Sequence, residues 1–356
     1  MRILFLFLVL LFAACPEQSC DSPSSPTTTT VPPACQWDPA LPASSDECRS
    51  PRVDIPFSWD AYQGIVAFGL GHEEQSKEDV LSYVSAAMSR GRNTFEICSE
   101  AEWWDEGSAE LPQKVRDVAR LQWTLDLIAR VPGAQVALIG NCTLKRQVNL
   151  DEQFIWAQVV AEIVTGKGVS HPEWGYVEGT MPFRNVAIFT HNEFDNCAGR
   201  TDWGGNKDWC AGKDEVGRHI RMYREAGIQY VTADDSFTRD PARTRGMPES
   251  QVYGFRLANK GAWPASFHPD RERLGQPWDP SLEDLQKLAR YNGTFVLSET
   301  VAYSEDAAQC DGLSTCDQAR IEELANRCAV VPECHLTFHC RSCLAGVAPS
   351  YIPEAR

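Results

Sequence analysis

The sequence predicts an α/β fold, a (β/α)8 TIM barrel preceded by a lipoprotein signal peptide and a disordered tether. Short apolar runs rich in Val, Ile and Phe alternate with helical patterns along most of the chain after residue 50. Such runs fit parallel strands that are buried on both faces. The roughly 300 residues of this part match one barrel better than two unrelated domains. We therefore expect one barrel domain over residues 51–356.

The first half of the predicted barrel alternates strands and helices. The strands are short runs of β-branched and aromatic residues, expected at 64–69, 93–98 and 134–139, and a fourth strand with the apolar run 186–189 ends in Asn192-Glu193. The helices show apolar residues every three or four positions, and they are expected at 76–88, 111–129 and 151–164. Ser76 is a plausible N-cap for the first helix, and Gly140 with Asn141 ends the third strand.

The second half continues this alternation, with one choice left open. A helix over 214–226 closes with Gly227, and a strand at 229–233 precedes Asp234 and Asp235. The sixth strand is either 252–257, which fits the pattern, or 265–268. The remaining elements are expected at 282–291 (helix), 294–298 (strand), 316–328 (helix) and 334–339 (strand). Their number and spacing suit eight βα units.

Residues 1–14 predict an export signal. Arg2 is followed by the apolar run Ile3–Phe12 and by two alanines before Cys15. The run is too short to span a bilayer as a mature helix, and its basic start and small final residues are typical of a secretory signal. Because Cys15 resembles the cysteine of a bacterial lipobox, we expect cleavage before it and its lipidation. An ordinary secreted protein is the alternative.

Residues 15–50 predict a linker that tethers the barrel to the bacterial cell envelope. The segment is rich in Ser, Thr, Pro and acidic residues, as in the run 25–33. Such a composition cannot bury enough apolar surface to fold.

Fourteen cysteines in an exported chain favour disulfides over metal binding or redox catalysis. Connectivity cannot be derived from sequence, but close spacing suggests the pairs Cys197–Cys210, Cys310–Cys316 and Cys328–Cys334. A zinc site in the final segment, with Cys334, Cys340, Cys343, His335 and His339, is a weaker alternative because it contains a single C-x-x-C.

The chain is acidic, with a net charge of −16 and a pI near 4.9. This charge disfavours nucleic acid and anionic membrane surfaces as partners, so we expect membrane contact only through the lipid anchor. A neutral carbohydrate is compatible with it. We expect a monomer that uses no metal and no cofactor.

Two glutamates follow or end predicted barrel strands. Glu193 stands after the fourth strand in R-N-V-A-I-F-T-H-N-E-F-D, and Glu299 ends the seventh in G-T-F-V-L-S-E-T. A carboxylate is costly to keep in a core but useful at the carboxyl ends of barrel strands, where active sites of this fold lie. Two such carboxylates are the minimum equipment for glycoside hydrolysis. Strand-end carboxylates with structural hydrogen bonds are the alternative.

This pattern resembles the retaining glycoside hydrolases of clan A, the cellulase- and mannanase-like superfamily. The resemblance implies that Glu193 is the general acid/base and Glu299 the nucleophile, while Asn192 hydrogen-bonds the sugar 2-hydroxyl. It also implies cleavage of β-glycosidic bonds in an oligo- or polysaccharide by double displacement. Many members carry an arginine on the second strand, where this chain has Glu96, with Arg92 just before the strand.

Other residues are candidate sugar contacts. His268 lies at the sixth strand, where clan members often carry an aromatic residue or a histidine, although a histidine that caps a turn is the alternative. Asp234 and Asn141 follow the fifth and third strands, and turn capping explains Asp234 equally well. Tryptophan faces pack well against sugars, and Trp103 and Trp104 occupy an acidic loop after the second strand. Further tryptophans in predicted loops are Trp174, Trp203, Trp209, Trp263 and Trp278, and local packing is the alternative for each of them.

Two other functions are compatible with this sequence. A barrel of the same fold could bind carbohydrate without cleaving it. A metal-dependent hydrolase would instead use His191, Glu193 and Asp195, which alternate along the fourth strand. No H-x-H motif on the first strand supports the metal site.

Overall fold

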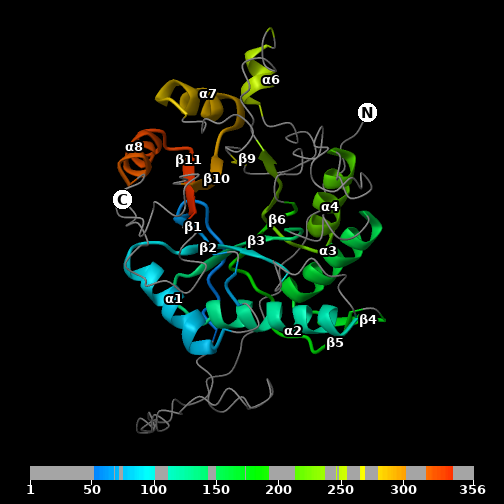
Figure 1. Cartoon of the computed structure of the whole chain (residues 1–356). Helices are drawn as coiled ribbons and strands as arrows, with labels where there is room; N and C mark the ends of the chain where they lie inside the picture. Colours follow the sequence, from blue (N-terminus) through cyan, green and yellow to red (C-terminus); the bar gives the residue numbers. More distant parts are fainter. Residues whose placement is uncertain are drawn as a thin grey trace, which may run out of the picture. The chain divides into compact units, whose positions relative to one another are not determined.

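Parallel strands surrounded by helices form the core of the computed structural model (Figure 1). All described residues belong to the unit Ser50–Arg356. They are residues 52–67, 69–71, 75–100, 111–142, 150–172, 174–191, 213–236, 246, 248–254, 265–268, 280–301 and 318–339. The predicted signal peptide, Cys15 and the predicted linker lie outside them.

Nine strand segments make up the main sheet, and every pairing in it is parallel. In chain order they are β1 (Gly64–Val66), β2 (Thr94–Cys98), β3 (Gln135–Ile139), β6 (Val186–Phe189), β7 (Val231–Thr232), β8 (Asp234–Ser236), β9 (Ala265–His268), β10 (Phe295–Val301) and β11 (Cys334–His339). They lie side by side in the order β7-β6-β3-β2-β1-β11-β10-β9-β8.

The two ends of this order belong to one strand, because only Ala233 separates β7 from β8. Val231 and Thr232 pair with β6, whereas Asp234, Asp235 and Ser236 pair with β9. The fifth strand therefore closes the ring, and the fold is the predicted eight-stranded barrel. Its fourth strand is β6 and its seventh is β10.

Helices follow most of the strands. They are α1 (Lys77–Ser89), α2 (Leu111–Ile128), α3 (Leu150–Val164), α4 (Lys213–Glu225), α6 (Glu249–Tyr253), α7 (Leu282–Asn292) and α8 (Gln318–Ala329). Ser76 is the predicted N-cap of α1, and a capping box joins its side chain and backbone to Asp79. Ser281 and Asp284 form the same arrangement at the start of α7.

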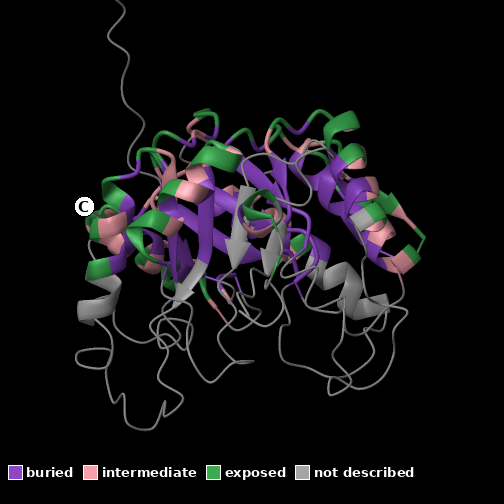
Figure 2. Cartoon of the chain, turned by 90° about the horizontal axis from the view of Figure 1, so that it is seen from above, coloured by how far each residue is buried: buried purple, intermediate pink, exposed green. Residues whose placement is uncertain are grey.

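Apolar residues form two layers on the two faces of the barrel sheet. Ile65, Phe95 and Leu138 belong to the outer layer, which packs against the helices. Val66 and Ile139 belong to the inner layer, which fills the barrel. The alternation follows from strand geometry, since successive side chains point to opposite faces. Figure 2 shows buried residues on the strands and exposed residues on the outward surfaces of the helices.

Aromatic side chains fill the amino end of the barrel. The Trp59 ring stacks on Tyr62 at 5.0 Å between centroids and meets Phe57 edge-on at 4.9 Å. The Tyr62 hydroxyl also forms a hydrogen bond with Thr337 on β11. A Cβ on Gly64 would lie 2.7 Å from Thr337 Oγ1 and 2.8 Å from the Tyr62 ring, so this close approach requires glycine.

The structure decides the choice left open at the sixth strand and adds one unpredicted feature. The sixth strand is β9, so the choice 265–268 is confirmed and 252–257 is wrong. Val252 and Tyr253 instead belong to α6, because a short apolar run does not separate helix from strand by periodicity alone. The structure also contains an unpredicted antiparallel hairpin between α3 and β6, formed by β4 (Val169–His171) and β5 (Gly175–Val177).

Within the described part of the chain, no helix is long and apolar enough to cross a lipid bilayer.

A partly buried ion-pair cluster attaches the segment before β1 to α2. Asp126 accepts hydrogen bonds from Arg52 at 2.7 Å and from Arg130 at 2.8 Å. The Arg52 guanidinium also lies 4.1 Å from the centre of the Phe183 ring. Burial alone would raise the pKa of Asp126, but its hydrogen bonds and the charges of Arg130 and Arg52 outweigh burial and hold that pKa below its ordinary value.

We expect Asp126→Asn to lower the free energy of unfolding at pH 7 by about 1–3 kcal/mol, because it removes charge-assisted hydrogen bonds. The lowered pKa makes the wild-type carboxylate stabilising above the pKa of unfolded aspartate, about 3.9. The difference between the proteins should therefore shrink as the pH falls below that value. Urea unfolding across this range measures it.

Asp54→Asn is the matched control. Asp54 pairs with Arg184 at 3.0 Å, but both side chains are about 60% exposed. Loss of such a pair should cost less than about 1 kcal/mol. Equal losses in the two variants would contradict a special role for Asp126.

Candidate active site at the carboxyl ends of the strands

The described residues reach the carboxyl ends of three neighbouring strands, β2, β3 and β6. They continue to Glu100, Cys142 and His191 respectively. Asn192 and Glu193 come directly after His191, but they lie outside the described residues, as do Trp103 and Trp104. Their predicted roles therefore stay predictions.

Three other predicted residues lie on neighbouring strands across the ring. Asp234 begins β8, His268 ends β9, and Glu299 lies near the end of β10. The structure describes their backbone and not their side chains. Asp234 thus belongs to a strand, whereas the sequence prediction placed it after one. Its backbone pairs with Ser266 of β9.

The backbone of β10 changes register close to Glu299. Leu297 pairs with Leu336 of β11, but the next pairing joins Thr300 to Phe338. One extra residue of β10 therefore stands between these pairs, in the segment of Ser298 and Glu299. Such bulges occur at barrel rims and next to active sites, where they redirect side chains.

Asn141 is fully buried immediately after β3. Its Nδ2 donates to the carbonyl oxygen of Thr190 at 3.4 Å, a long hydrogen bond that connects it to the end of β6. Within the described part of the chain, its Oδ1 has no hydrogen-bond partner. An amide acceptor at this position suits contact with a hydroxyl group.

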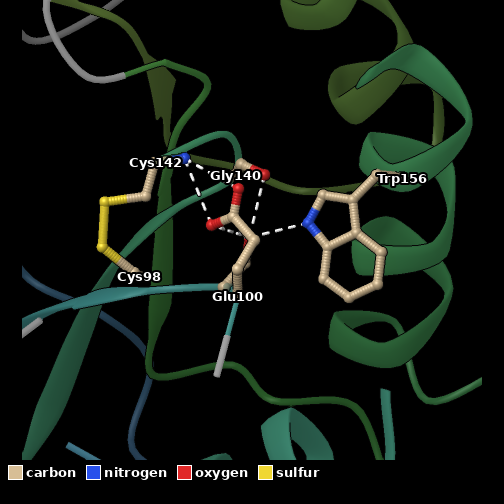
Figure 3. Close-up of a disulfide and its surroundings, with 6 residues drawn as sticks. Cys98, Glu100, Gly140, Cys142 and Trp156 are labelled. Atoms are coloured by element: carbon tan, nitrogen blue, oxygen red, sulfur yellow. Dashed lines mark hydrogen bonds between the residues drawn. A yellow bond between two sulfur atoms is a disulfide. The ribbon is translucent and has the colours of Figure 1, made fainter. Parts of the chain in front are cut away.

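A buried polar network joins the ends of β2 and β3 (Figure 3). The Glu100 carboxylate accepts the N–H of Cys142, with N···O distances of 3.0 and 3.2 Å. The Ser99 hydroxyl lies 2.9 Å from the Gly140 carbonyl oxygen and 3.1 Å from Glu100 Oε2. Trp156 of α3 donates to Ser99 Oγ at 2.8 Å.

A disulfide between Cys98 and Cys142 joins the same two strand ends. Neither this disulfide nor the participation of Ser99 and Glu100 was predicted from the sequence. The available signal was the position of each cysteine, at or just after the end of a neighbouring predicted strand. Cys328 and Cys334 form the predicted disulfide, which excludes Cys334 as a zinc ligand while the bond is intact. The pairs Cys197–Cys210 and Cys310–Cys316 lie outside the described residues.

The hydroxyl of Tyr223 in α4 lies next to Gly140, which belongs to this network. That hydroxyl would lie 2.6 Å from a Cβ on Gly140, so any side chain at position 140 would have to displace the Tyr223 hydroxyl. Burial, followed by the negative charge of Glu100, raises the pKa of Tyr223 above its ordinary value. The hydroxyl is buried and has no hydrogen-bond partner among the residues that the structure describes.

Two buried histidines are in contact, one just after β6 and one in α4. The His191 and His219 rings are 4.6 Å apart between centroids and meet edge to face. His191 Nδ1 lies 3.2 Å from Thr190 Oγ1, and His219 Nδ1 lies 2.9 Å from the Glu215 carbonyl oxygen. Burial lowers the pKa of His219 to about 4, so its imidazole is neutral at physiological pH.

No group of three or more potential metal ligands occurs in the described ranges. Glu193 and Asp195, the other two members of the alternative metal triad, lie outside those ranges.

Glu96 and Arg92 occupy different ends of β2. Glu96 lies in the middle of the strand and is fully buried. Arg92 precedes the strand, at its amino end, and its guanidinium lies 4.2 Å from the centre of the Phe338 ring. Burial lowers the pKa of Arg92 to about 10. Arg92 therefore does not take the place of a strand-two arginine at the carboxyl end.

Trp174 serves local packing, the alternative to sugar stacking. It is 3% exposed, and its ring packs 4.7 Å from that of Trp156. The insertion of β4 and β5 carries it into the core next to α3. Trp203, Trp209, Trp263 and Trp278 lie outside the described residues.

Comparisons with known proteins give no family assignment. No protein-family model matches the chain, and no curated protein matches it. Among solved structures, a family 5 glycoside hydrolase from Bacteroides vulgatus superposes with a TM-score of 0.48 at 11% identity, over 83% of this chain and 62% of that one. This chain thus spans less than two thirds of that protein's length.

Two other solved structures have comparable scores. A family 5 mannosidase from Rhizomucor miehei gives a TM-score of 0.49 at 11% identity, over 80% of this chain and 84% of that one. A D-psicose 3-epimerase from Clostridium cellulolyticum gives 0.40 at 11% identity, over 83% and 90%. At these scores and identities, the likenesses do not assign an activity.

We expect Tyr223→Phe to leave the free energy of unfolding unchanged or to raise it by about 1–2 kcal/mol, because a buried hydroxyl without a partner is unfavourable. Tyr62→Phe, the same chemical change at a hydrogen-bonded hydroxyl, should lower it by about 1 kcal/mol or more. Urea unfolding of both variants measures the contrast. A clear loss in Tyr223→Phe would show that its hydroxyl has a partner.

Proposed function

We propose that this protein is a retaining glycoside hydrolase that cleaves β-glycosidic bonds of an oligo- or polysaccharide with Glu193 and Glu299. One observation carries the proposal. The fourth and seventh strands of the closed ring are β6 and β10, and Glu193 follows β6 in the sequence while Glu299 lies near the end of β10. The carboxyl ends of barrel strands are where this fold places its catalytic residues.

The reaction needs two carboxyl groups in different protonation states. Glu193 would donate a proton to the leaving-group oxygen while a Glu299 oxygen attacks the anomeric carbon, which gives a covalent glycosyl-enzyme. Glu193 would then take a proton from a water molecule that attacks the same carbon, and Glu299 would be released. This route requires carboxyl groups about 5–5.5 Å apart. Asn192, next to Glu193, would bind the sugar 2-hydroxyl.

The other candidate contacts also belong to the carboxyl side of the barrel. Asn141 follows β3, and His268 ends β9, the strand that pairs with β10. We propose that both contact the sugar, with Asp234, Trp103 and Trp104 as further contacts. No cofactor enters this scheme.

The disulfides support the proposed export of the chain. Cys98–Cys142 and Cys328–Cys334 would persist in an oxidising compartment and are rare in a reducing cytosol. We propose that the signal peptide directs export, that Cys15 is lipidated after cleavage, and that residues 16–50 tether a monomeric barrel to the envelope.

We expect Glu299→Gln to abolish turnover and to keep sugar binding, since its amide is nearly isosteric but cannot act as the nucleophile. Glu193→Gln should lower kcat by about 10²–10⁴-fold with a poor leaving group, and less with an activated aryl leaving group that needs little protonation. Hydrolysis of aryl β-glycosides and of glucan, mannan and xylan measures both effects. A 2-deoxy-2-fluoro glycoside should label Glu299, as peptide mass spectrometry would show.

Glu333→Gln is the matched control, because Glu333 directly precedes β11 at the amino end of the barrel. It should leave kcat unchanged. Sugar binding without turnover in the wild type would instead favour a non-catalytic carbohydrate-binding protein. Loss of turnover on exhaustive chelation would favour the metal-dependent alternative.

A further inference from the structure

We propose that the Cys98–Cys142 disulfide and Glu100 are positioning groups for the active site: they fasten the ends of β2 and β3 and, through Asn141, hold the end of β6 from which Glu193 follows. The catalytic part of this proposal rests on the proposed function. Its structural part does not.

Contacts attach the end of β2 to the end of β3 beyond the residues that pair in the sheet. The strand ladder ends with Cys98 opposite Ile139. After it, the Ser99 N–H donates to the Ile139 carbonyl oxygen at 2.9 Å. The disulfide and the hydrogen bond from the Cys142 N–H to Glu100 then join residues that lie beyond the last backbone pairing of the two strands.

Further contacts attach the end of β3 to the end of β6. The Gly140 N–H donates to the Phe189 carbonyl oxygen at 2.7 Å, and Asn141 Nδ2 donates to the Thr190 carbonyl oxygen at 3.4 Å. The Thr190 N–H in turn donates to Thr232 of β7 at 2.8 Å. A continuous set of contacts thus runs from the end of β2 to the segment three residues before Glu193.

Two helices support this arrangement from the outer side. Trp156 of α3 donates to Ser99 Oγ, and the Tyr223 hydroxyl of α4 packs against Gly140. Glu100 is 4% exposed, so its hydrogen bonds are made away from bulk water. Because Gly140, Asn141 and Cys142 are consecutive, a shift of Cys142 moves the residues that contact β6.

The other described disulfide lies at the opposite end of the barrel. Cys334 is the first residue of β11, and Cys328 lies near the end of α8, whereas Cys98 is the last residue of β2. Both bonds constrain the unfolded chain and stabilise the fold. Of these two disulfides, Cys98–Cys142 alone lies at the carboxyl side. Removing each in turn therefore distinguishes a catalytic effect from a general loss of stability.

The experiment compares two double variants of the full chain, produced in an oxidising compartment: Cys98→Ala/Cys142→Ala and the control Cys328→Ala/Cys334→Ala. Urea unfolding defines conditions in which each is fully folded. There we expect the first variant to lose about 10–100-fold in kcat with little change in KM, because small misplacements of catalytic groups are costly. Hydrogen exchange should become faster in residues 186–191. The control should keep both kcat and this protection.

A further variant, Asn141→Ala with both disulfides intact, tests the contact to β6. A positioning role predicts a lower kcat and faster exchange in 189–191, whereas a sugar contact alone would raise KM and leave exchange unchanged. Wild-type kcat and protection in the first double variant would overturn the proposal. If the wild type hydrolyses no glycoside, the proposed function fails, and the exchange comparison still decides whether the disulfide holds the end of β6.

Discussion

Closure of the parallel sheet through Ala233 is the constraint on which the rest of the structure depends. An open parallel sheet leaves two edges with unpaired N–H and C=O groups, and a closed ring leaves none. Here one short strand pairs with β6 through its first residues and with β9 through its last. Every strand also directs its carboxyl end to the same side.

The side chains at the amino end of the barrel differ in type from those at its carboxyl end. Aromatic rings from the segment before β1 fill the amino end, where Trp59, Tyr62 and Phe57 pack together. The carboxyl ends of β2, β3 and β6 instead carry serine, glutamate, asparagine and histidine side chains. Buried polar groups are tolerated where they find hydrogen-bond partners, and Ser99, Glu100 and the Asn141 amide nitrogen each do so here.

Most of the fold could be predicted from the sequence, because each strand is an apolar run that is followed by a polar residue or a glycine. The sixth strand stayed open between two choices, because the run at Val252 is too short to distinguish a strand from the single-turn helix α6. The pair Cys98–Cys142 was missed for another reason. Proximity in sequence favours local pairs such as Cys328–Cys334, whereas cysteines 44 residues apart meet only because β2 and β3 are neighbours. Glu100 was overlooked because its main partner is a backbone N–H, which has no sequence signal.

The described disulfides have a consequence for the order in which the molecule assembles. Both join residues close in the chain, at separations of 44 and 6, whereas the contact between Tyr62 and Thr337 spans 275 residues. Short loops cost less entropy to close than long ones. A polypeptide that emerges amino end first can therefore oxidise Cys98 and Cys142 once its first two βα units and third strand are out. The remaining strands would then be added to an already cross-linked edge, and the ring would be completed last.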